Sequence, residues 1–348
     1  MEDGKKNTIK TIHDIAQEAG VSATTVSFVI NGKGSINPNT RERVLEIIKR
    51  SNYAPNKVAR QLRKKQTYSF GVVIDHFHNS FFNSVFDGIS SVAEPAGYSY
   101  LAAESRGNYE KEKREIQLLL EHGVDGLILF PCTDDASFLL EQQQRFDVPI
   151  VLIGNNYSGV AIPTVSADNY FGAYLATRRL IELNRPPVWH IAGPQAISMC
   201  RQRRAGFMET LEKYSLIANP SDYVIVADDI SISAGYLAME QICRLAEPPF
   251  SIFAVNDVTA FGVIKYCKQH HLSIPEEMYL IGFGNIDLIE ELDIGLSSIR
   301  ISAVDMGKQS ARMLINCQKD HIKKCRENDI ILPVELMERK STFHFSKT

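Results

Sequence analysis

The stretch VSATTVSFVING, residues 21–32, decides how this chain begins to fold. Read as a helix, it places Val26, Val29 and Ile30 on one face, at the i, i+3, i+4 spacing of a buried stripe. The opposite face carries small or neutral side chains, without the Glu and Lys of an ordinary solvated helix: Ala23, Thr24, Ser27, Phe28 and Asn31. A short face of this kind suits a helix whose first turn enters the major groove of DNA.

The residues before this stretch predict a partner helix. Thr11 caps a helix in which Asp14 completes an acidic capping box, and Gly20 supplies the left-handed residue that ends it. Ser22 then starts the second helix by accepting from the amide of Thr25. Two short amphipathic helices joined by so tight a turn form a helix-turn-helix. The competing interpretation is a helical hairpin that only fills a core, and the small outward side chains favour the helix-turn-helix.

A third helix and a basic segment follow. Pro38 opens the helix after Asn37, because a proline at the first helical position loses no hydrogen bond. Its basic residues either reach phosphates or form an exposed face: Arg41, Arg43, Lys49 and Arg50. The segment NKVARQLRKK, residues 56–65, is either a solvated basic linker or a hinge that folds on DNA, with Leu62 wedged into a minor-groove base step.

Charge is divided unequally along the chain, whose formal net charge is −3. Residues 1–67 carry 13 Lys and Arg against 6 Asp and Glu, a net of +7, so the remaining 25 and 35 give −10. A small basic unit attached to an acidic body is typical of a phosphate-binding module on a soluble protein.

Length, cysteine usage and apolar runs limit the class of protein. With 348 residues, 44% of them hydrophobic, the chain can form two or three compact units. Six scattered cysteines form no C-x-x-C pair, so we expect reduced thiols in a cytosolic protein. The polar N-terminus lacks the apolar segment that directs secretion, and no apolar run approaches the length of a membrane span. His76 and His78 lack further ligands at recognisable spacing, so no metal site is expected.

From Tyr68 on, short apolar runs typical of strands alternate with amphipathic helical segments, such as residues 110–121 and 173–183. The strand-like runs are residues 70–75, 98–103, 126–130, 149–154, 188–193, 223–227, 251–256 and 279–284. This alternation predicts doubly wound parallel sheets, and eight units exceed one compact open sheet. We therefore expect an α/β core of two lobes, which bind ligands at the carboxyl ends of their strands.

Together these residues resemble the lactose-repressor (LacI/GalR) family of bacterial transcription regulators, over nearly the whole chain. TIHDIAQEAGVSATTVSFVING, residues 11–32, is similar to the family's N-terminal signature. YAPNKVARQLR, residues 53–63, is similar to its hinge segment. VDGLILFP, ADNYFGAYLATRRLIELN, FAVND, IGFGN and LPVELMERKS resemble successive landmarks of the family's sensor core.

The resemblance implies a homodimer whose two headpieces bind a pseudo-palindromic operator. It also implies a core like that of a periplasmic sugar-binding protein, with two lobes that close on a small effector and three chain crossings near Ser166, Arg300 and Asp329. The expected domains are an all-α helix-turn-helix headpiece (1–55), a hinge helix and linker (56–67) and an effector-binding and dimerisation core (68–348). Within the core the expected N-lobe is 68–165 and 301–329, and the C-lobe is 166–300 and 330–348.

Carried over by position, the resemblance assigns the DNA contacts. The residues expected to choose bases are Ala23, Thr24 and Phe28, and those expected on phosphates are Ser22, Thr25, Ser27 and Asn31. Leu62 matches the family's intercalating leucine, with Ala59 and Arg63 beside it in the minor groove. Many members carry a polar residue where this chain has Phe28, and phenylalanine contacts a thymine methyl rather than guanine. A standard operator sequence is therefore not expected.

The resemblance also assigns an effector site. Its residues are Phe81, Phe82, Asp168, Arg203, Asn256 and Asp257. Asp168 and Asp257 are equally suited to capping the helices that follow them. Many sugar- or purine-binding members have Asp where this chain has Gly284, so the class of effector stays open.

These observations favour a sequence-specific DNA-binding regulator, a repressor whose operator affinity is controlled by a small effector, sugar-like or another metabolite. The alternative is a cytosolic small-solute-binding protein of the periplasmic-binding type, and the basic headpiece argues against it. No G-x-S-x-G, P-loop or nucleophile–base pair indicates an enzyme, and no cofactor is expected. The expected partners are double-stranded operator DNA, an effector and a second copy of the chain, with a protein co-regulator or a tetramer left open and no membrane. The expected location is the bacterial cytoplasm, with nucleoid association when the protein is bound to DNA.

Overall fold

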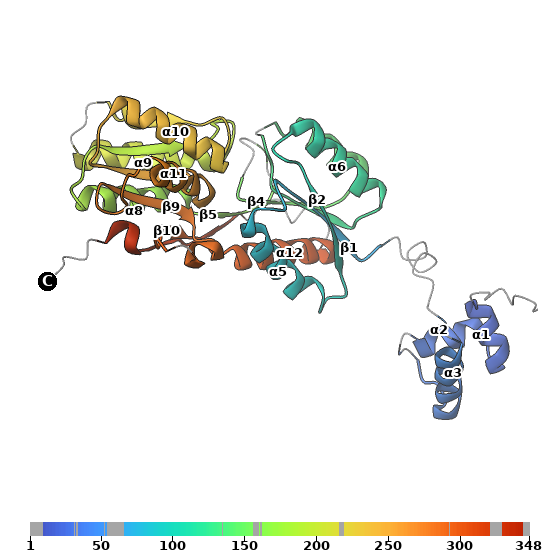
Figure 1. Cartoon of the computed structure of the whole chain (residues 1–348). Coiled ribbons are helices and arrows are strands. Elements are labelled where there is room, and N and C mark those ends of the chain that lie inside the picture. The colour runs from blue at the N-terminus through green and yellow to red at the C-terminus, as the bar shows by residue number, and fades with distance from the viewer. Residues whose placement is uncertain are drawn as a thin grey trace, which may run out of the picture. The chain divides into compact units, whose positions relative to one another are not determined.

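The computed structural model describes residues 10–30, 32, 34–51, 53, 66–133, 135–155, 160, 162–215, 219–291, 293–320 and 329–343. The chain divides into two compact units, Met1–Thr67 and Tyr68–Thr348. The first is helical, and the second contains two six-stranded sheets with helices on their faces (Figure 1).

The helical unit is built from α1 (Ile12–Ala19), α2 (Ala23–Ile30) and α3 (Pro38–Arg50). Thr11 accepts from the Asp14 amide and Asp14 accepts from the Thr11 amide, so the expected capping box is present. Gly20 ends α1 at φ 62° and leaves two residues before α2 starts, which confirms the helix-turn-helix. Its core is a single cluster: Ile15, Ala16, Ala19, Val26, Val29, Val44 and Ile47.

The first sheet of the second unit has the order β11-β5-β4-β3-β1-β2, and its strand pairs are parallel. Its strands are β1 (Ser69–Ile74), β2 (Ser99–Glu104), β3 (Gly126–Leu129), β4 (Ile150–Ile153), β5 (Thr164–Ala167) and β11 (Ile330–Leu332). One face packs against α5 (Ser80–Ala93) and α12 (Ala303–Asp320), and the other against α6 (Tyr109–Glu121) and α7 (Ser137–Phe146). We refer to this sheet and its helices as the N-lobe.

The second sheet has the order β12-β10-β9-β8-β6-β7 and is parallel except for β12, which runs antiparallel to β10. Its strands are β6 (Val188–Ala192), β7 (Val224–Val226), β8 (Phe250–Ala254), β9 (Met278–Gly284), β10 (Ser297–Arg300) and β12 (Glu335–Met337). The helices α8 (Asn169–Glu182) and α9 (Ser198–Ser215) cover one face, and α10 (Ile232–Leu245) and α11 (Asp257–Gln269) cover the other. These elements form the C-lobe, so the expected pair of doubly wound lobes is confirmed.

The strand pairing shows that the chain crosses between the lobes at other residues than expected in two places. β5 belongs to the N-lobe up to Ala167, one residue past the expected crossing at Ser166. The expected crossing at Asp329 is wrong, because β11 pairs with β5 and the chain leaves the N-lobe only after Leu332. Pro333 explains the difference: it lacks an amide hydrogen and splits one apolar run into β11 and β12, one for each sheet.

The cysteines correct one further expectation. Cys132, Cys200, Cys243 and Cys267 carry free thiols, as expected, but Cys317 is disulfide-bonded. None of the described helices combines the length and apolar character that crossing a membrane requires.

Candidate functional site

The exposed face of α2 carries the side chains that the sequence singled out for DNA. Ser22 Oγ accepts from the Thr25 amide at 3.1 Å and lies 2.9 Å from Thr25 Oγ1, so the two hydroxyl groups organise the first turn. Thr24 and Phe28 are exposed, whereas Ser27 is half-buried. Ala23 is also half-buried and packs against the core of the helical unit, so only part of its surface faces outward. Asn31 lies outside the described residues, as do the hinge residues Ala59, Leu62 and Arg63.

Phe28 is held in place although it is 44% exposed. A Cβ built on Gly34 would stand 3.3 Å from Phe28 Cδ2, so the ring lies over the backbone of the loop that follows α2. Gly34 has φ +80°, a conformation that favours glycine. The ring therefore has a defined support and an open outer face, which is what apolar contact with a base edge requires.

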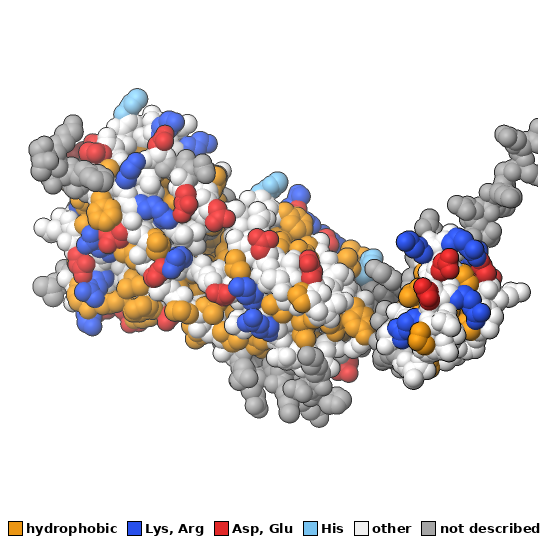
Figure 2. Space-filling model, turned by 90° about the horizontal axis from the view of Figure 1, so that it is seen from below, with side chains coloured by type: hydrophobic (Ala, Val, Ile, Leu, Met, Phe, Trp, Pro, Cys, Tyr) orange, Lys and Arg blue, Asp and Glu red, His pale blue; other side chains and the backbone are white. Residues whose placement is uncertain are grey.

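Basic side chains lie on other elements of the helical unit. Figure 2 shows Lys and Arg side chains at several places on the surface of the helical unit. Lys10 and Arg50 both bind Glu18, and their hydrogen bonds hold the pKa of that carboxyl below its usual range. Within the described residues Arg41, Arg43 and Lys49 on α3 form no ion pair, which leaves their charge for phosphates.

A cavity lies between the two lobes of the second unit, at the carboxyl ends of strands from both sheets. Five of the six residues expected to bind an effector line it: Phe81, Phe82, Arg203, Asn256 and Asp257. Asp168 is not a lining residue, because its carboxylate accepts from the Phe171 amide at 2.9 Å and caps α8. Its neighbour Asn169 lines the cavity instead.

Arg203 is a buried structural group as well as a lining residue. Its Nε and Nη2 donate to Asn169 Oδ1 at 3.0 and 2.8 Å, and its Nη1 donates to the Val255 carbonyl at 2.5 Å. The guanidinium also lies 3.6 Å from the ring centre of Phe283. Burial lowers the pKa of Arg203 to about 10, which leaves it charged at neutral pH.

Asp257 takes the space beside two glycines of β9. It accepts from Ser298 Oγ at 2.6 Å and from the Ile286 amide at 3.1 Å, while burial raises its pKa to about 6. A Cβ on Gly282 would lie 2.2 Å from Asp257 Oδ1, and one on Gly284 would lie 3.0 Å from Oδ2. Gly284 also has φ +129°, which L side chains rarely adopt. The glycine at this position is therefore required by the geometry of its surroundings.

An aromatic wall closes the N-lobe side of the cavity. The ring centres of Phe82 and Phe130 lie 5.1 Å apart, those of Phe81 and Phe82 lie 5.2 Å apart, and all three rings meet edge to face. Four further lining residues were not among those expected from the sequence: Phe130, Asn169, Phe283 and Asp75. Phe130 and Asp75 end predicted strands, and the rule that ligands bind at the carboxyl ends of parallel strands would have found them.

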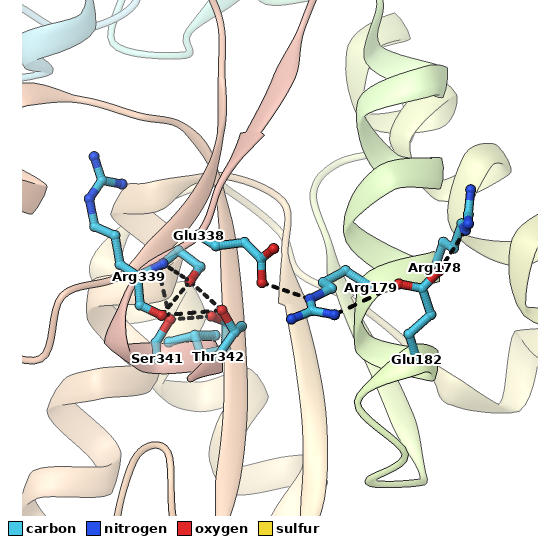
Figure 3. A network of polar contacts seen from close by, with 9 residues as sticks. Arg178, Arg179, Glu182, Glu338, Arg339, Ser341 and Thr342 are labelled. Atoms are coloured by element: carbon cyan, nitrogen blue, oxygen red, sulfur yellow. Dashed lines mark hydrogen bonds and ion pairs between the residues drawn. The ribbon is translucent and has the colours of Figure 1, made fainter. Parts of the chain in front are cut away.

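The C-terminal segment is tied to the rim of this cavity. Arg339 Nη1 donates to Asn285 Oδ1 at 2.8 Å, and Asn285 directly follows the lining residue Gly284. Glu338 and Arg179 point toward each other and form an ion pair at 2.7 Å, as Figure 3 shows. The loop after β9 is thus positioned by the last residues of the described chain.

Comparisons with known proteins match both units. The model of the family described as "Bacterial regulatory proteins, lacI family" matches residues 11–56. The model of "Periplasmic binding proteins and sugar binding domain of LacI family" matches residues 67–339. The HTH-type transcriptional repressor PurR of Vibrio atlanticus (strain LGP32) is 30% identical over 334 residues, which cover 95% of this chain and 98% of the relative.

Two solved structures extend the likeness. The Lac repressor dimer bound to operator and the anti-inducer ONPF superposes with a TM-score of 0.85, at 24% identity, over 97% of this chain and 100% of that one. The complex of the transcriptional regulator CelR with cellobiose superposes with a TM-score of 0.70, at 25% identity, over 95% of this chain and 99% of that one.

Proposed function

The chain belongs to the LacI family of bacterial regulatory proteins, and from this premise we propose how its two units act together. It is a DNA-binding transcription regulator and not an enzyme. We infer that it is a transcriptional repressor. The helical unit binds an operator, and a small effector bound between the lobes changes the affinity for that operator. The observation that carries this function is the combination in one chain of a helix-turn-helix with an interlobe cavity.

On the DNA side, α2 lies in the major groove. Ala23, Thr24 and Phe28 read bases, and the phosphate contacts come from Ser22, Thr25, Ser27 and Asn31. Two observations support this proposal. Thr24 and Phe28 are exposed, and the Phe28 ring packs against the backbone at Gly34. An apolar ring on this face favours a thymine methyl over guanine.

The hinge at residues 56–67 couples the two units. We propose that it folds on DNA, with Leu62 inserted into a minor-groove base step and Ala59 and Arg63 beside it. Five basic residues within ten positions attract this segment to phosphates, which lowers the free energy of the folded, bound form.

On the effector side, a ligand between the lobes contacts Phe81, Phe82, Arg203, Asn256 and Asp257. Closing on this ligand changes the angle between the lobes, and that change reaches the hinge segments. A coupling free energy of about 1–3 kcal/mol is sufficient, since roughly 1.4 kcal/mol changes operator affinity tenfold.

We further propose a homodimer on a pseudo-palindromic operator. Large apolar side chains stand out from α10, where Leu237 and Leu245 are each 61% exposed and Ile232 is 43% exposed. A second copy would cover such side chains. A regulator of chromosomal DNA acts in the cytoplasm, and it is associated with the nucleoid while it is bound to DNA. The exposed apolar side chains of α10 are also of the kind that a protein co-regulator would cover.

The experiment that tests this function is operator selection followed by a gel-shift assay. Random duplexes with two inverted half-sites are selected on the full chain, and the winner is compared with a scrambled duplex of equal length and composition. We expect specific retardation of the selected duplex, with affinity that falls steeply as salt is raised. Equal retardation of both duplexes at every salt concentration, with and without candidate effectors, would contradict the proposal.

A further inference from the structure

An exposed aromatic surface lies on α8 and α9, which cover the face of the C-lobe sheet opposite to α10 and α11. Tyr170, Phe171 and Tyr214 are 39%, 44% and 43% exposed, and Tyr174 is half-buried. The ring centre of Tyr174 lies 5.7 Å from that of Phe171 and 6.4 Å from that of Tyr214. We refer to these four residues as the α8–α9 patch. Exposed aromatic side chains that gather in this way are typical of protein–protein contact surfaces.

Polar contacts hold the rings of the patch in place. The Tyr170 hydroxyl donates to Glu209 of α9, and the hydroxyl oxygens of Tyr174 and Tyr214 lie 3.5 Å apart. Arg178 Nη1 donates to the Tyr174 hydroxyl at 3.2 Å. The patch is therefore ordered before a partner binds, which lowers the entropy that association costs.

The spacing of three residues on α8 suits a contact between two copies of this helix. Tyr170, Tyr174 and Arg178 follow one another at intervals of four residues, so they form one ridge along the helix. Ridges of this spacing pack against each other in the commonest class of helix crossing. If a two-fold axis passes at Tyr174, the residue before it on the ridge faces the residue after it in the second copy. Arg178 of each copy then lies over the Tyr170 ring of the other.

The charges on the patch fit this pairing. Because Tyr170 is bonded to Glu209, the Arg178 guanidinium would approach both an aromatic ring and a carboxylate of the second copy. Each of these contacts occurs twice, since a two-fold axis makes the interface isologous. A surface that carries the two signs in this arrangement is complementary to itself, and it is less suited to a strongly acidic or strongly basic partner.

Arg178 is placed to make such a contact. Its side chain is 50% exposed, and its ion pair with Glu182 at 2.8 Å lies along the same helix. The neighbouring Arg179 is bonded instead to Glu338 at 2.7 Å. Figure 3 shows that Arg179 points toward Glu338, whereas Arg178 points away from it. Only the first of these two arginines therefore belongs to the exposed ridge.

We propose that the α8–α9 patch is a contact surface for a second copy of this chain, with a two-fold axis at Tyr174. This contact is separate from the one proposed for α10, because the two surfaces lie on opposite faces of the C-lobe sheet. A chain that uses both contacts forms a tetramer, since each isologous contact joins two copies. The inference depends neither on the operator nor on the effector.

The test is sedimentation velocity of the full chain over a wide range of protein concentration. We expect wild type to pass from dimer to tetramer as the concentration rises. Tyr174→Glu places two like charges opposite each other at the axis, so the dissociation constant of this contact should rise by about tenfold or more. Leu118→Glu adds the same charge at a 48% exposed position of α6, and this control should sediment as wild type does.

A charge reversal tests the pairing itself. Arg178→Glu and Glu209→Arg should each weaken the contact, because each brings like charges together across the axis. The two substitutions in one chain exchange the signs and should restore the tetramer. Urea unfolding of each variant shows whether the fold is retained, so that a loss of assembly can be assigned to the contact.

Two results would overturn the inference. The first is an equal size of wild type and Tyr174→Glu at every concentration, which would mean that a different protein, or none, covers the patch. The second is a doubly reversed chain that assembles as weakly as the single variants, which would mean that Arg178 does not face Glu209 of the second copy. A wild-type dimer that Tyr174→Glu converts to a monomer would support the contact at α8 and would contradict the dimer proposed through α10.

Discussion

Asp257 Oδ2 lies 3.0 Å from the point where a Cβ on Gly284 would stand. The Asp257 carboxyl group, at the start of α11, therefore fills the space beside Gly284 at the end of β9. Substitutions at Gly284 separate two effects on stability, the strain of the backbone conformation and the repulsion from an added charge.

Gly284→Asp is expected to destabilise the C-lobe. The backbone at φ +129° costs about 1–3 kcal/mol for an L residue, and the new carboxylate would also lie close to Asp257. The measurement is urea unfolding followed by the fluorescence of Trp189, the single tryptophan of the chain, which is buried in β6. Gly284→Ala has the same backbone strain but adds no charge, so its loss in the free energy of unfolding should be smaller. A Gly284→Asp variant as stable as wild type would refute this account of the glycine.

Phe28→Arg is expected to change which bases are preferred more than it changes total affinity. An arginine at this position can donate two hydrogen bonds to guanine, which is worth about 1–3 kcal/mol of discrimination. Sequencing of the duplexes selected by each variant gives the preference directly. Leu45→Arg adds the same charge at a 48% exposed position of α3 and should tighten binding to all duplexes alike. Identical selected sites for Phe28→Arg and wild type would show that this side chain reads no base.

Leu62→Ala is expected to weaken operator binding by about 1–3 kcal/mol, the scale of the unstacking energy that an apolar wedge exploits. The core should unfold at the same urea concentration as in wild type, because Leu62 lies outside it. Titration gel shifts on the selected operator measure the loss. Leu118→Ala, at a 48% exposed position of α6, is the matched truncation and should bind as wild type does. If both variants bind equally well, the wedge has no part in recognition.

His190 makes the stability of the C-lobe depend on pH. It is fully buried beside Phe253, donates from Nδ1 to the Phe253 carbonyl at 2.9 Å, and burial lowers its pKa to about 3. The unfolded chain binds a proton near pH 6.5 while the folded chain does not, so stability falls as pH drops from 6.5 toward 3.

The contribution of His190 should reach about 4 kcal/mol at the acid end of this range, at about 1.4 kcal/mol for each unit of pKa difference. Urea unfolding at a series of pH values measures it. His190→Gln should flatten the dependence, whereas His78→Gln, at an exposed position, should leave it as it is. Parallel curves for wild type and His190→Gln would rule out the assignment.

The fold could be predicted from the sequence where the residue pattern and the length of a segment indicated the same type of element. The capping box at Thr11 and the left-handed Gly20 mark the first helix from local chemistry alone, and eight of the twelve strands that the structure describes have apolar runs long enough to recognise. The four missed strands, β5, β10, β11 and β12, have three or four residues each, as do the expected strands β3, β4 and β7, so length alone does not separate them. Such short segments are strands only because a neighbouring strand supplies the hydrogen bonds, and that pairing is invisible to local pattern.

The cavity was predictable in part. Arg203 could be placed by resemblance, but its commitment to Asn169 and the Val255 carbonyl depends on contacts 34 and 52 residues away along the chain. Asp168 was assigned to the ligand although its ordinary capping role accounts for it. Asp75 was not assigned to the site because a lone aspartate after a strand has no periodic signature.

The dipeptide Pro333-Val334 joins the last strand of one sheet to the last strand of the other. Because both neighbours are fixed by ladders of hydrogen bonds, relative rotation of the lobes at this crossing must be taken up by a few backbone torsions. The proline ring fixes one of those torsions, so the link bends chiefly about the remaining ones. The direction of lobe movement is thus restricted by covalent geometry before any metabolite arrives.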